Sequence, residues 1–242
     1  MKIFYILFFK YIFVIYKIKK MNFEILQKSI PEESLRAFME KESRYDNRKF
    51  YESRKFNFSF GVLNTYKYSA IGSLGLNKIL LVLKNSGKKT NQENPKINII
   101  IDDFESEKKP KKIYDFVEKI IKNNLIFEKN DIQEKEEYNL YITIESIDGN
   151  IYEVIAKSLI KFFSKENNIN IIFNKQFESR TVCFINGNIL FDPLKQEAEL
   201  ADFICNIIKF KNDNNKFILY KIGGLCTNLK LIKEAVLQMD NN

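Results

Sequence analysis

Arginine is scarce in this chain, yet three of its arginines lie close together. Of 39 basic residues among 242, five are arginine: Arg36, Arg44, Arg48, Arg54 and Arg180. A guanidinium group is planar and binds two oxygens of a carboxylate or a phosphate at once, whereas a lysine ammonium acts as a point charge. The three arginines between 44 and 54 therefore predict a bound anion or a specific ion pair in this stretch.

Two interpretations of this stretch remain open. In the first, its arginines pair with Asp46, Glu52 or acids elsewhere and fix the N-terminal arm onto a sheet, a role for which bidentate geometry favours arginine. In the second, its basic residues contact RNA phosphates or a neighbouring subunit. The residues concerned are Arg44, Arg48, Arg54, Lys49 and Lys55.

The overall charge points to an anionic partner. The formal net charge is +8, with 29% charged residues, which favours RNA, DNA or an acidic protein face. A composition rich in lysine, asparagine, isoleucine and phenylalanine also arises from nucleotide bias, so charge alone does not select among these partners. The apolar fraction of 45% is sufficient for a sizeable core.

The absence of histidine excludes several kinds of site. With no histidine in the sequence, Ser-His-Asp chemistry, Cys-His chemistry and histidine-ligated metals are ruled out. Cys183, Cys205 and Cys226 form no C-x-x-C pair, which argues against a disulfide framework and a structural zinc site. Any catalysis has to use carboxylates, lysines or the substrate's own phosphate, and we expect neither a metal nor a cofactor.

The segment 1–20 is apolar and aromatic, with Lys10 and Lys17 inside it. As a membrane helix it is short and would place Lys10 near the middle of the bilayer. As a signal peptide it lacks a small-residue cleavage site. A third interpretation is that translation starts at Met21. We therefore treat 1–20 as an N-terminal extension, either an anchor or a mis-assigned start, and 21–242 as the domain.

Strand patterns dominate the first half of the domain. Phe56, Phe58 and Phe60 alternate with polar residues and precede Gly61, and short strands follow over 66–73 and 77–84. The run 96–102 has a purely apolar centre, which predicts a strand buried on both faces. The intervening 85–95 is predicted to be a loop because it is polar and holds glycine and proline.

Two helices interrupt the strands, and a third closes the chain. An apolar stripe predicts an amphipathic helix through Ile113 and Ile121, whereas 151–163 is apolar nearly all round and should be sandwiched between layers. The strand 138–147 leads to a turn at 148–150, where Gly149 can take positive φ. The remaining predictions are strands at 180–186, 188–191, 202–210 and 215–222, a turn at Asp192-Pro193, and a helix through Leu229, Ile232 and Val236.

This order of elements predicts an α+β fold, because runs of strands with helices inserted at two places differ from regular βαβ alternation. No linker rich in proline, glycine and serine divides the chain, so a single compact domain is expected.

Several motifs resemble the RNase PH-like family, whose N-terminal pattern reads R-x-D-G-R, then E-x-R, then G-V-L. The family's strand, D-G-N turn and long buried helix match residues 140–163. Its terminal strand pair and D-P turn match 185–193, and its acidic stretch matches Glu197 and Glu199. Its closing G-G and helix match the segment that begins at 221. The landmarks run in the expected order from about residue 30 to 238. They include Arg44, Asp46, Arg48, Glu52, Arg54, Gly61, Asp148, Gly149, Asp192, Pro193, Gly223 and Gly224.

The resemblance implies an RNase PH-like (ribosomal protein S5 domain 2-like) fold, and the motifs are most similar to the non-catalytic subunits of the eukaryotic RNA exosome. Active members are implied to use a phosphate-binding arginine near the first long helix and paired aspartates before the D-G turn. Here no arginine lies between Arg54 and Arg180, and the matching strand positions are Tyr141 and Thr143. Asn47 replaces the glycine of D-G-R, and two other glycine-bearing segments near Ser69 and Gly75 also depart from the pattern.

The function that the resemblance implies is structural. It implies a subunit of a six-membered ring of RNase PH-like chains, with cap subunits, a separate hydrolytic nuclease and RNA as partners, in the nucleus or nucleolus and the cytoplasm. Such a subunit would present RNA for 3′–5′ processing and carry no catalytic residues. The alternatives are a divergent phosphorolytic 3′–5′ exoribonuclease and a protein tethered to a membrane through 1–20.

Overall fold

The computed structural model describes residues 39, 43–89, 96–103, 111–122, 124–127, 136–167, 169–211, 217–225 and 228–239. The chain divides into two units, Met1–Phe50 and Tyr51–Asn242. The segment 1–20 and the predicted boundary after it lie outside the described residues. In the ranges given above, no helix has the length and apolar character needed to cross a membrane.

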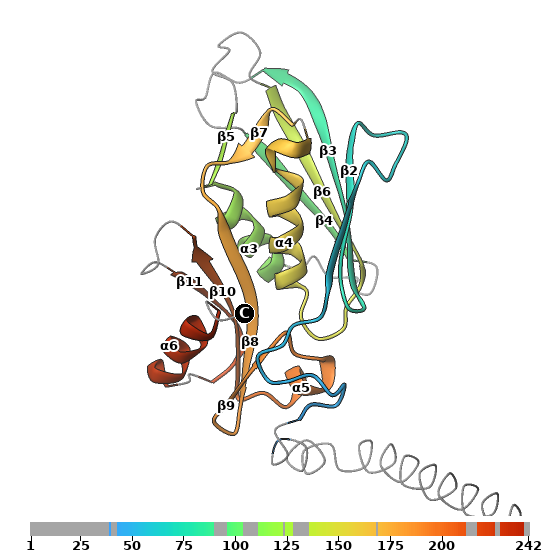
Figure 1. The fold of residues 1–242 in the computed structure, drawn as a ribbon. Coiled ribbons are helices and arrows are strands. Elements are labelled where there is room, and N and C mark those ends of the chain that lie inside the picture. Colours follow the sequence, from blue (N-terminus) through green and yellow to red (C-terminus); the bar gives the residue numbers. More distant parts are fainter. Residues whose placement is uncertain are drawn as a thin grey trace, which may run out of the picture. The chain divides into compact units, whose positions relative to one another are not determined.

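The first sheet of the Tyr51–Asn242 unit has five strands in the order β1-β2-β3-β6-β4 (Figure 1). All neighbours are antiparallel except β4 and β6, which are parallel. The strands are β1 (Phe56–Phe60), β2 (Tyr68–Leu74), β3 (Asn77–Lys89), β4 (Ile97–Asp103) and β6 (Glu136–Ser146).

The second sheet has four antiparallel strands in the order β11-β10-β8-β9, and β5 pairs with β7 in a separate two-stranded ribbon. These strands are β5 (Leu125–Phe127), β7 (Ile171–Phe173), β8 (Phe177–Ile185), β9 (Asn188–Phe191), β10 (Phe203–Phe210) and β11 (Phe217–Gly224). The helices are α3 (Lys111–Lys122), α4 (Tyr152–Phe162), the 3₁₀ turn η1 (Lys165–Asn167), α5 (Lys195–Glu199) and α6 (Leu229–Gln238).

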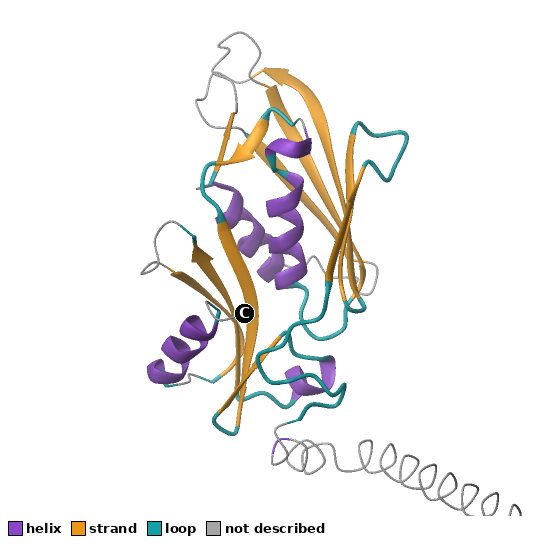
Figure 2. Ribbon diagram, in the orientation of Figure 1, coloured by secondary structure: helices purple, strands orange, loops and turns teal. Residues whose placement is uncertain are grey.

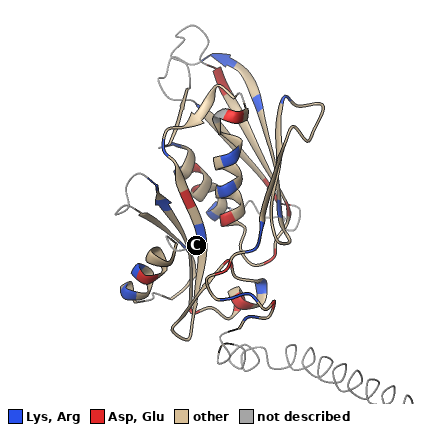
Figure 3. Ribbon diagram, viewed as in Figure 1, with Lys and Arg blue, Asp and Glu red and all other residues tan. Residues whose placement is uncertain are grey.

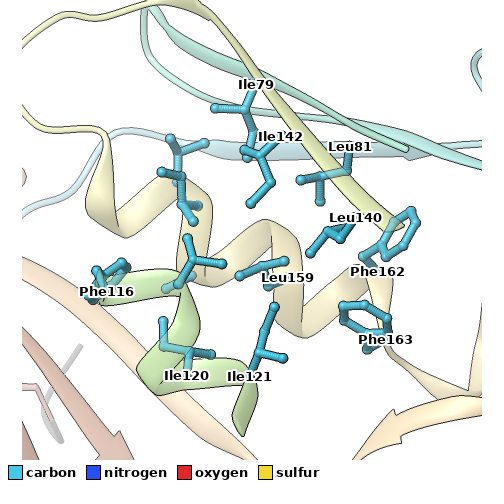
Figure 4. Packing of buried hydrophobic residues seen from close by; sticks show 14 of the residues in the cluster. Ile79, Leu81, Phe116, Ile120, Ile121, Leu140, Ile142, Leu159, Phe162 and Phe163 are labelled. Carbon is cyan, nitrogen blue, oxygen red and sulfur yellow. The ribbon is translucent and has the colours of Figure 1, made fainter. Parts of the chain in front are cut away.

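Helix α4 lies between the two sheets (Figure 2) and packs against both β2 and β8. It is buried on almost every side because its sequence lacks a continuous polar face. The neighbouring α3 contributes one apolar stripe to the same core. Figure 4 shows how α3 and α4 meet the strands through Ile79, Leu81, Phe116, Ile120, Ile121, Leu140, Ile142, Leu159, Phe162 and Phe163.

A second apolar cluster lies on the other side of the four-stranded sheet, where α6 packs. Ile232, Ala235 and Val236 of this helix contact side chains from β8, β9 and β10. The sheet is therefore covered on both faces, which explains why nearly every residue of β10 is buried.

The structure confirms the main elements predicted from the sequence. The strand with alternating phenylalanines is β1, the amphipathic helix is α3 with the expected buried stripe, and the sandwiched helix is α4. Gly149 has φ of +88° and Asn47 has φ of +64°, as their turns require. The short elements β5, β7 and α5 were not predicted, because three to five residues carry too little periodicity.

Two predictions were wrong. The strand over 96–102 is β4, an edge strand whose residues are half-buried or exposed, because only β6 pairs with it. Residues 85–89 are not loop but continue β3, with an irregularity in register between Asn85 and Lys89 and positive φ at Gly87. The closing helix predicted through Leu229, Ile232 and Val236 is confirmed as α6, which buries Ile232 and Val236 and leaves Leu229 73% exposed at its start.

The cysteines of the second sheet give a simple test of this packing. Cys183 and Cys205 are fully buried, and burial raises the pKa of the Cys205 thiol to about 12. Because the thiolate is the reactive form, neither residue should react with iodoacetamide at pH 8 in the native chain, and both should react in urea. Peptide mapping measures this, and rapid native labelling of Cys205 would contradict the packing of β10.

Candidate functional site

Arg54 lies just before β1, and its guanidinium group is held by Asp192, which follows β9. Arg54 Nε donates to Asp192 Oδ2 at 2.8 Å, and Nη2 donates to Oδ1 at 2.7 Å. The backbone N–H of Arg54 also donates to Oδ2, at 2.9 Å. This is the bidentate geometry that lysine cannot provide. The Asp192 side chain is only 1% exposed, so the pair is buried.

A second carboxylate, Asp148, holds the other edge of the same guanidinium group. Arg54 Nη1 donates to Asp148 Oδ2 at 2.6 Å, and Nη2 donates to the Asp148 carbonyl at 3.2 Å. Asn77 bonds the same turn from β3: its Nδ2 donates to the Asp148 carbonyl at 3.0 Å, and its Oδ1 accepts the Asp148 N–H at 2.6 Å. The Lys195 N–H donates to Asp148 Oδ1 at 3.4 Å. Both carboxylate oxygens of Asp148 are thus engaged.

We name Arg54, Asn77, Asp148 and Asp192 the Arg54 cluster. Besides Asn77 of β3, it brings together three segments that are far apart in sequence: the entry to β1, the turn after β6 and the turn after β9. These segments carry the E-x-R, D-G-N and D-P motifs noted in the sequence, so the motifs meet at one place. Sequence reasoning had placed the partners of Arg54 among Asp46, Glu52 or more distant acids, and the structure assigns them to the distant ones.

Two glycines allow this close approach. A Cβ atom on Gly149 would lie 2.1 Å from the Pro193 carbonyl oxygen, and one on Gly75 would lie 2.4 Å from Arg54 Cδ. Both glycines have positive φ, +88° and +61°. The D-G-N turn therefore packs directly against the D-P turn, and any side chain at Gly149 would separate them.

The electrostatics of the cluster suit a permanent ion pair. Burial by itself lowers the pKa of Arg54, but contacts with Asp192 and then Asp148 outweigh it and raise the pKa above its ordinary value. Arg54 is therefore charged at every accessible pH. One cation between two carboxylates offers no surplus positive charge for a phosphate group, and its donors already have acceptors.

The first part of the arginine-rich stretch, residues 44–50, belongs to the N-terminal unit. Arg48 Nε donates to Asp46 Oδ2 at 2.6 Å, and Asn47 donates its N–H to the Arg44 carbonyl at 3.0 Å. Burial acts to raise the pKa of Asp46, but Arg48 and Arg44 together bring it below its usual value. In this unit Arg44 is buried and Lys49 is exposed. Glu52 and Lys55, which belong to the Tyr51–Asn242 unit, are also exposed.

The remaining motif glycines serve backbone geometry. Gly61 follows β1 with φ of +72° and donates its N–H to the Ser69 carbonyl. Gly223 and Gly224 end β11, and a Cβ atom on Gly224 would lie 2.2 Å from the Asp202 carbonyl oxygen. Pro193 lies at the turn against Gly149.

The strand positions at which the resemblance implies catalytic aspartates in active members are Tyr141 and Thr143 of β6. Both alternate with the fully buried Leu140, Ile142 and Ile144, so they lie on the face of the sheet away from the core. On the described part of this face, the carboxylate nearest in register is Asp102 of β4, which pairs with Thr143.

Asp102 was missed by sequence reasoning, which had assigned it to the end of a strand buried on both faces. It lines a cavity of about 680 Å³ between β4 and α3, together with Lys111, Tyr114 and Asp115. This is the region between the fourth strand and the first long helix, where the family resemblance implies a phosphate-binding cation. In the described ranges, no group of three or more cysteine, aspartate or glutamate residues is arranged to hold a metal ion.

Comparison with known proteins gives matches by structure. No protein-family model and no curated protein matches the sequence. A chain of the Archaeoglobus fulgidus exosome with RNA bound to the active site superposes with a TM-score of 0.70 at 18% identity, covering 86% of this chain and 93% of that one. A chain of an archaeal exosome core gives 0.66 at 19% identity, covering 89% and 94%. Rice (Oryza sativa) Rrp46 gives 0.65 at 11% identity, covering 82% and 93%.

These similarities extend over most of both chains, so they concern the whole architecture rather than one motif. At 11–19% identity, these similarities establish the fold alone. The two sheets, the helices packed on them and the two turns held by Arg54 thus form an α+β fold similar to that of these exosome chains, as the RNase PH-like motifs of the sequence predict.

Proposed function

We propose that this chain is a non-catalytic subunit of an RNA exosome, and that it supports 3′–5′ RNA processing by a separate nuclease. The observation that carries the proposal is the chemistry of β6 and the turn after it. Tyr141 and Thr143 have no carboxylate to offer a leaving oxygen, and both oxygens of Asp148 are engaged by Arg54 and the Lys195 N–H. A phosphorolytic site needs an acid near the leaving oxygen and free cations for the attacking phosphate.

The partners follow from this proposal. We expect other RNase PH-like chains in a six-membered ring, cap subunits, a hydrolytic nuclease and RNA, in the nucleus or nucleolus and the cytoplasm. Among exosome subunits, the sequence motifs are most similar to ribosomal RNA-processing protein forty-three. The extension 1–20 gives a tethered protein as an alternative, which detergent fractionation of the native chain distinguishes.

The first test is enzymatic. The purified chain, alone and with the RNase PH-like chains that co-isolate with it, should release no nucleoside diphosphates from single-stranded RNA when phosphate is added. Affinity purification followed by mass spectrometry should recover those chains as partners. Phosphate-dependent turnover by this chain would overturn the non-catalytic assignment, and failure to recover any RNase PH-like partner would overturn the ring assignment.

A divergent phosphorolytic exoribonuclease is the rival function, and the cavity between β4 and α3 is what favours it. There Lys111 could hold phosphate, and Asp102 or Asp115 could supply the acid. If turnover is found, the variants Asp102→Asn and Asp148→Asn separate the two sites. Loss of activity in the first alone places the chemistry in this cavity, and loss in the second with the fold intact places it at the turn after β6.

A further inference from the structure

A basic groove runs beside the C-terminal half of α4, away from β6 and from the β4–α3 cavity. It has a volume of about 340 Å³ and lies between β1, α4 and β8, with Lys211 beyond the end of β10. Figure 3 shows basic residues along α4 and on β8. The charged residues that line the groove are four cations and one carboxylate: Lys157, Lys161, Arg180, Lys211 and Glu178.

Two of these cations are already neutralised. Arg180 Nη2 lies 2.9 Å from Glu178 Oε1, and its Nη1 donates to Ser53 Oγ at 3.0 Å. Lys157 Nζ lies 2.5 Å from Oε1 of Glu153, which is fully buried beneath it. Glu153 also accepts the Thr181 N–H at 2.7 Å, which anchors α4 to β8. Lys157 and Arg180 therefore fix the wall of the groove.

The surplus positive charge comes from Lys161 and Lys211. Both are exposed, and neither has a carboxylate within ion-pair distance among the residues that the structure describes. Lys161 lies four residues after Lys157, so the two share one face of α4, one turn apart. An anion that enters the groove would therefore meet the unpaired ammonium groups of Lys161 and Lys211, next to the paired side chains of Lys157 and Arg180.

The groove continues beyond these two lysines into a second cavity of about 430 Å³. Both cavities are lined by Ile160, Lys161, Phe177 and Lys211, so they form one path. The second cavity adds Lys175, whose ammonium lies 5.7 Å from the centre of the Phe210 ring, and one acid, Glu166. Its cations come from three places in the fold: Lys161 from α4, Lys175 from the segment after β7 and Lys211 from the end of β10.

Three aromatic rings line this path in addition to the cations. Phe56 lines the first cavity, Phe173 lines the second and Phe177 lines both. Phe177 is buried in the floor of the groove, whereas Phe56 and Phe173 are only partly buried, and these two rings are the accessible ones. Basic side chains interleaved with accessible aromatic rings are the arrangement that binds single-stranded nucleic acid, because phosphates meet the charges and bases meet the rings. An acidic peptide would use only the charges.

We propose that this groove binds the sugar–phosphate backbone of single-stranded RNA, with Lys161 and Lys211 as the phosphate contacts. The inference rests on the proposed function, which supplies RNA as the ligand, and it adds a contact surface that is separate from the positions on β6. It gives a non-catalytic subunit a direct way to hold RNA.

The test compares two double variants of the full chain that lose the same charge. Lys161→Gln/Lys211→Gln alters the groove, and Lys230→Gln/Lys233→Gln alters two exposed lysines of α6 on the other side of the second sheet. Fluorescence anisotropy with a single-stranded oligoribonucleotide is measured over a range of salt concentrations. The groove variant should bind about tenfold more weakly at 0.1 M salt, and its log–log salt slope should fall by roughly 1.4, about 0.7 for each lost phosphate contact.

The control variant should keep wild-type affinity to within about twofold, apart from a small general charge effect. Equal loss in both variants, no loss in either, or no RNA binding by the wild-type chain would each overturn the proposal. Competition by polyglutamate that is as strong as competition by RNA, and equally dependent on Lys161 and Lys211, would show an acidic-protein site instead. None of these outcomes bears on ring membership, because co-isolation of partner chains tests that separately.

Discussion

Replacing Arg54 by alanine is expected to destabilise the folded chain by about 3–5 kcal/mol, because it leaves the buried Asp192 carboxylate and the adjacent Asp148 without their cation. The loss should be seen as a lower urea midpoint in circular dichroism, with an unchanged slope. Arg54→Lys should recover only part of this stability, since lysine keeps the charge but cannot bridge two carboxylates.

A matched control is Lys122→Ala, which removes the cation of an exposed pair with Glu118 on α3. Such an i,i+4 pair contributes at most about 0.5 kcal/mol, so this variant should unfold close to wild type. Similar small losses in both variants would contradict the structural role of Arg54. If Arg54 instead contacts RNA, the alanine variant would stay stable and bind RNA less tightly.

Replacing Gly149 by alanine should cost about 3 kcal/mol or more, which makes it the second large effect. The new methyl group would lie 2.1 Å from the Pro193 carbonyl oxygen, so the two turns would have to move apart. Positive φ adds about 1–2 kcal/mol for any residue with a Cβ atom. Thermal or urea unfolding measures the sum, and the separation of the turns should weaken the Arg54 contacts to Asp148 and Asp192 as well.

Gly187→Ala is the control for this prediction. Gly187 lies in the turn between β8 and β9 with φ of +80°, yet a Cβ atom there has no neighbour within 4 Å. The Gly187→Ala variant should therefore lose only the free energy of unfolding that comes from placing alanine at positive φ, about 1–2 kcal/mol. An equal loss of stability in Gly149→Ala and Gly187→Ala would mean that backbone conformation alone causes both losses. The turns after β6 and β9 would then not pack as described.

Double substitution separates a shared site from two independent ones. Because Gly149 lies next to Asp148 and against Pro193, the effects of Gly149→Ala and Arg54→Ala should be less than additive, since either change opens the same contact. Gly187→Ala combined with Arg54→Ala should add within about 0.5 kcal/mol, because Gly187 lies at the far end of the β8–β9 hairpin.

The sequence by itself determined the local elements and much of the chemistry. Period-two and helical apolar patterns located β1, β6, α3 and α4, because side-chain periodicity follows directly from backbone geometry. The absence of histidine excluded whole classes of catalysis, and the scarcity of arginine drew attention to Arg54 before its partners were known.

Only the tertiary structure decided how these parts are used. The partners of Arg54 lie 94 and 138 residues away, and nothing in the local sequence specifies which acids fold back onto it. The apolar run of β4 predicted burial, but strand order placed it at a sheet edge, where one neighbour is missing. The groove at Lys161 and Lys211 likewise exists because α4, β1 and β8 converge in the fold. Its lining residues are far apart in the chain, so the sequence does not show that they lie together.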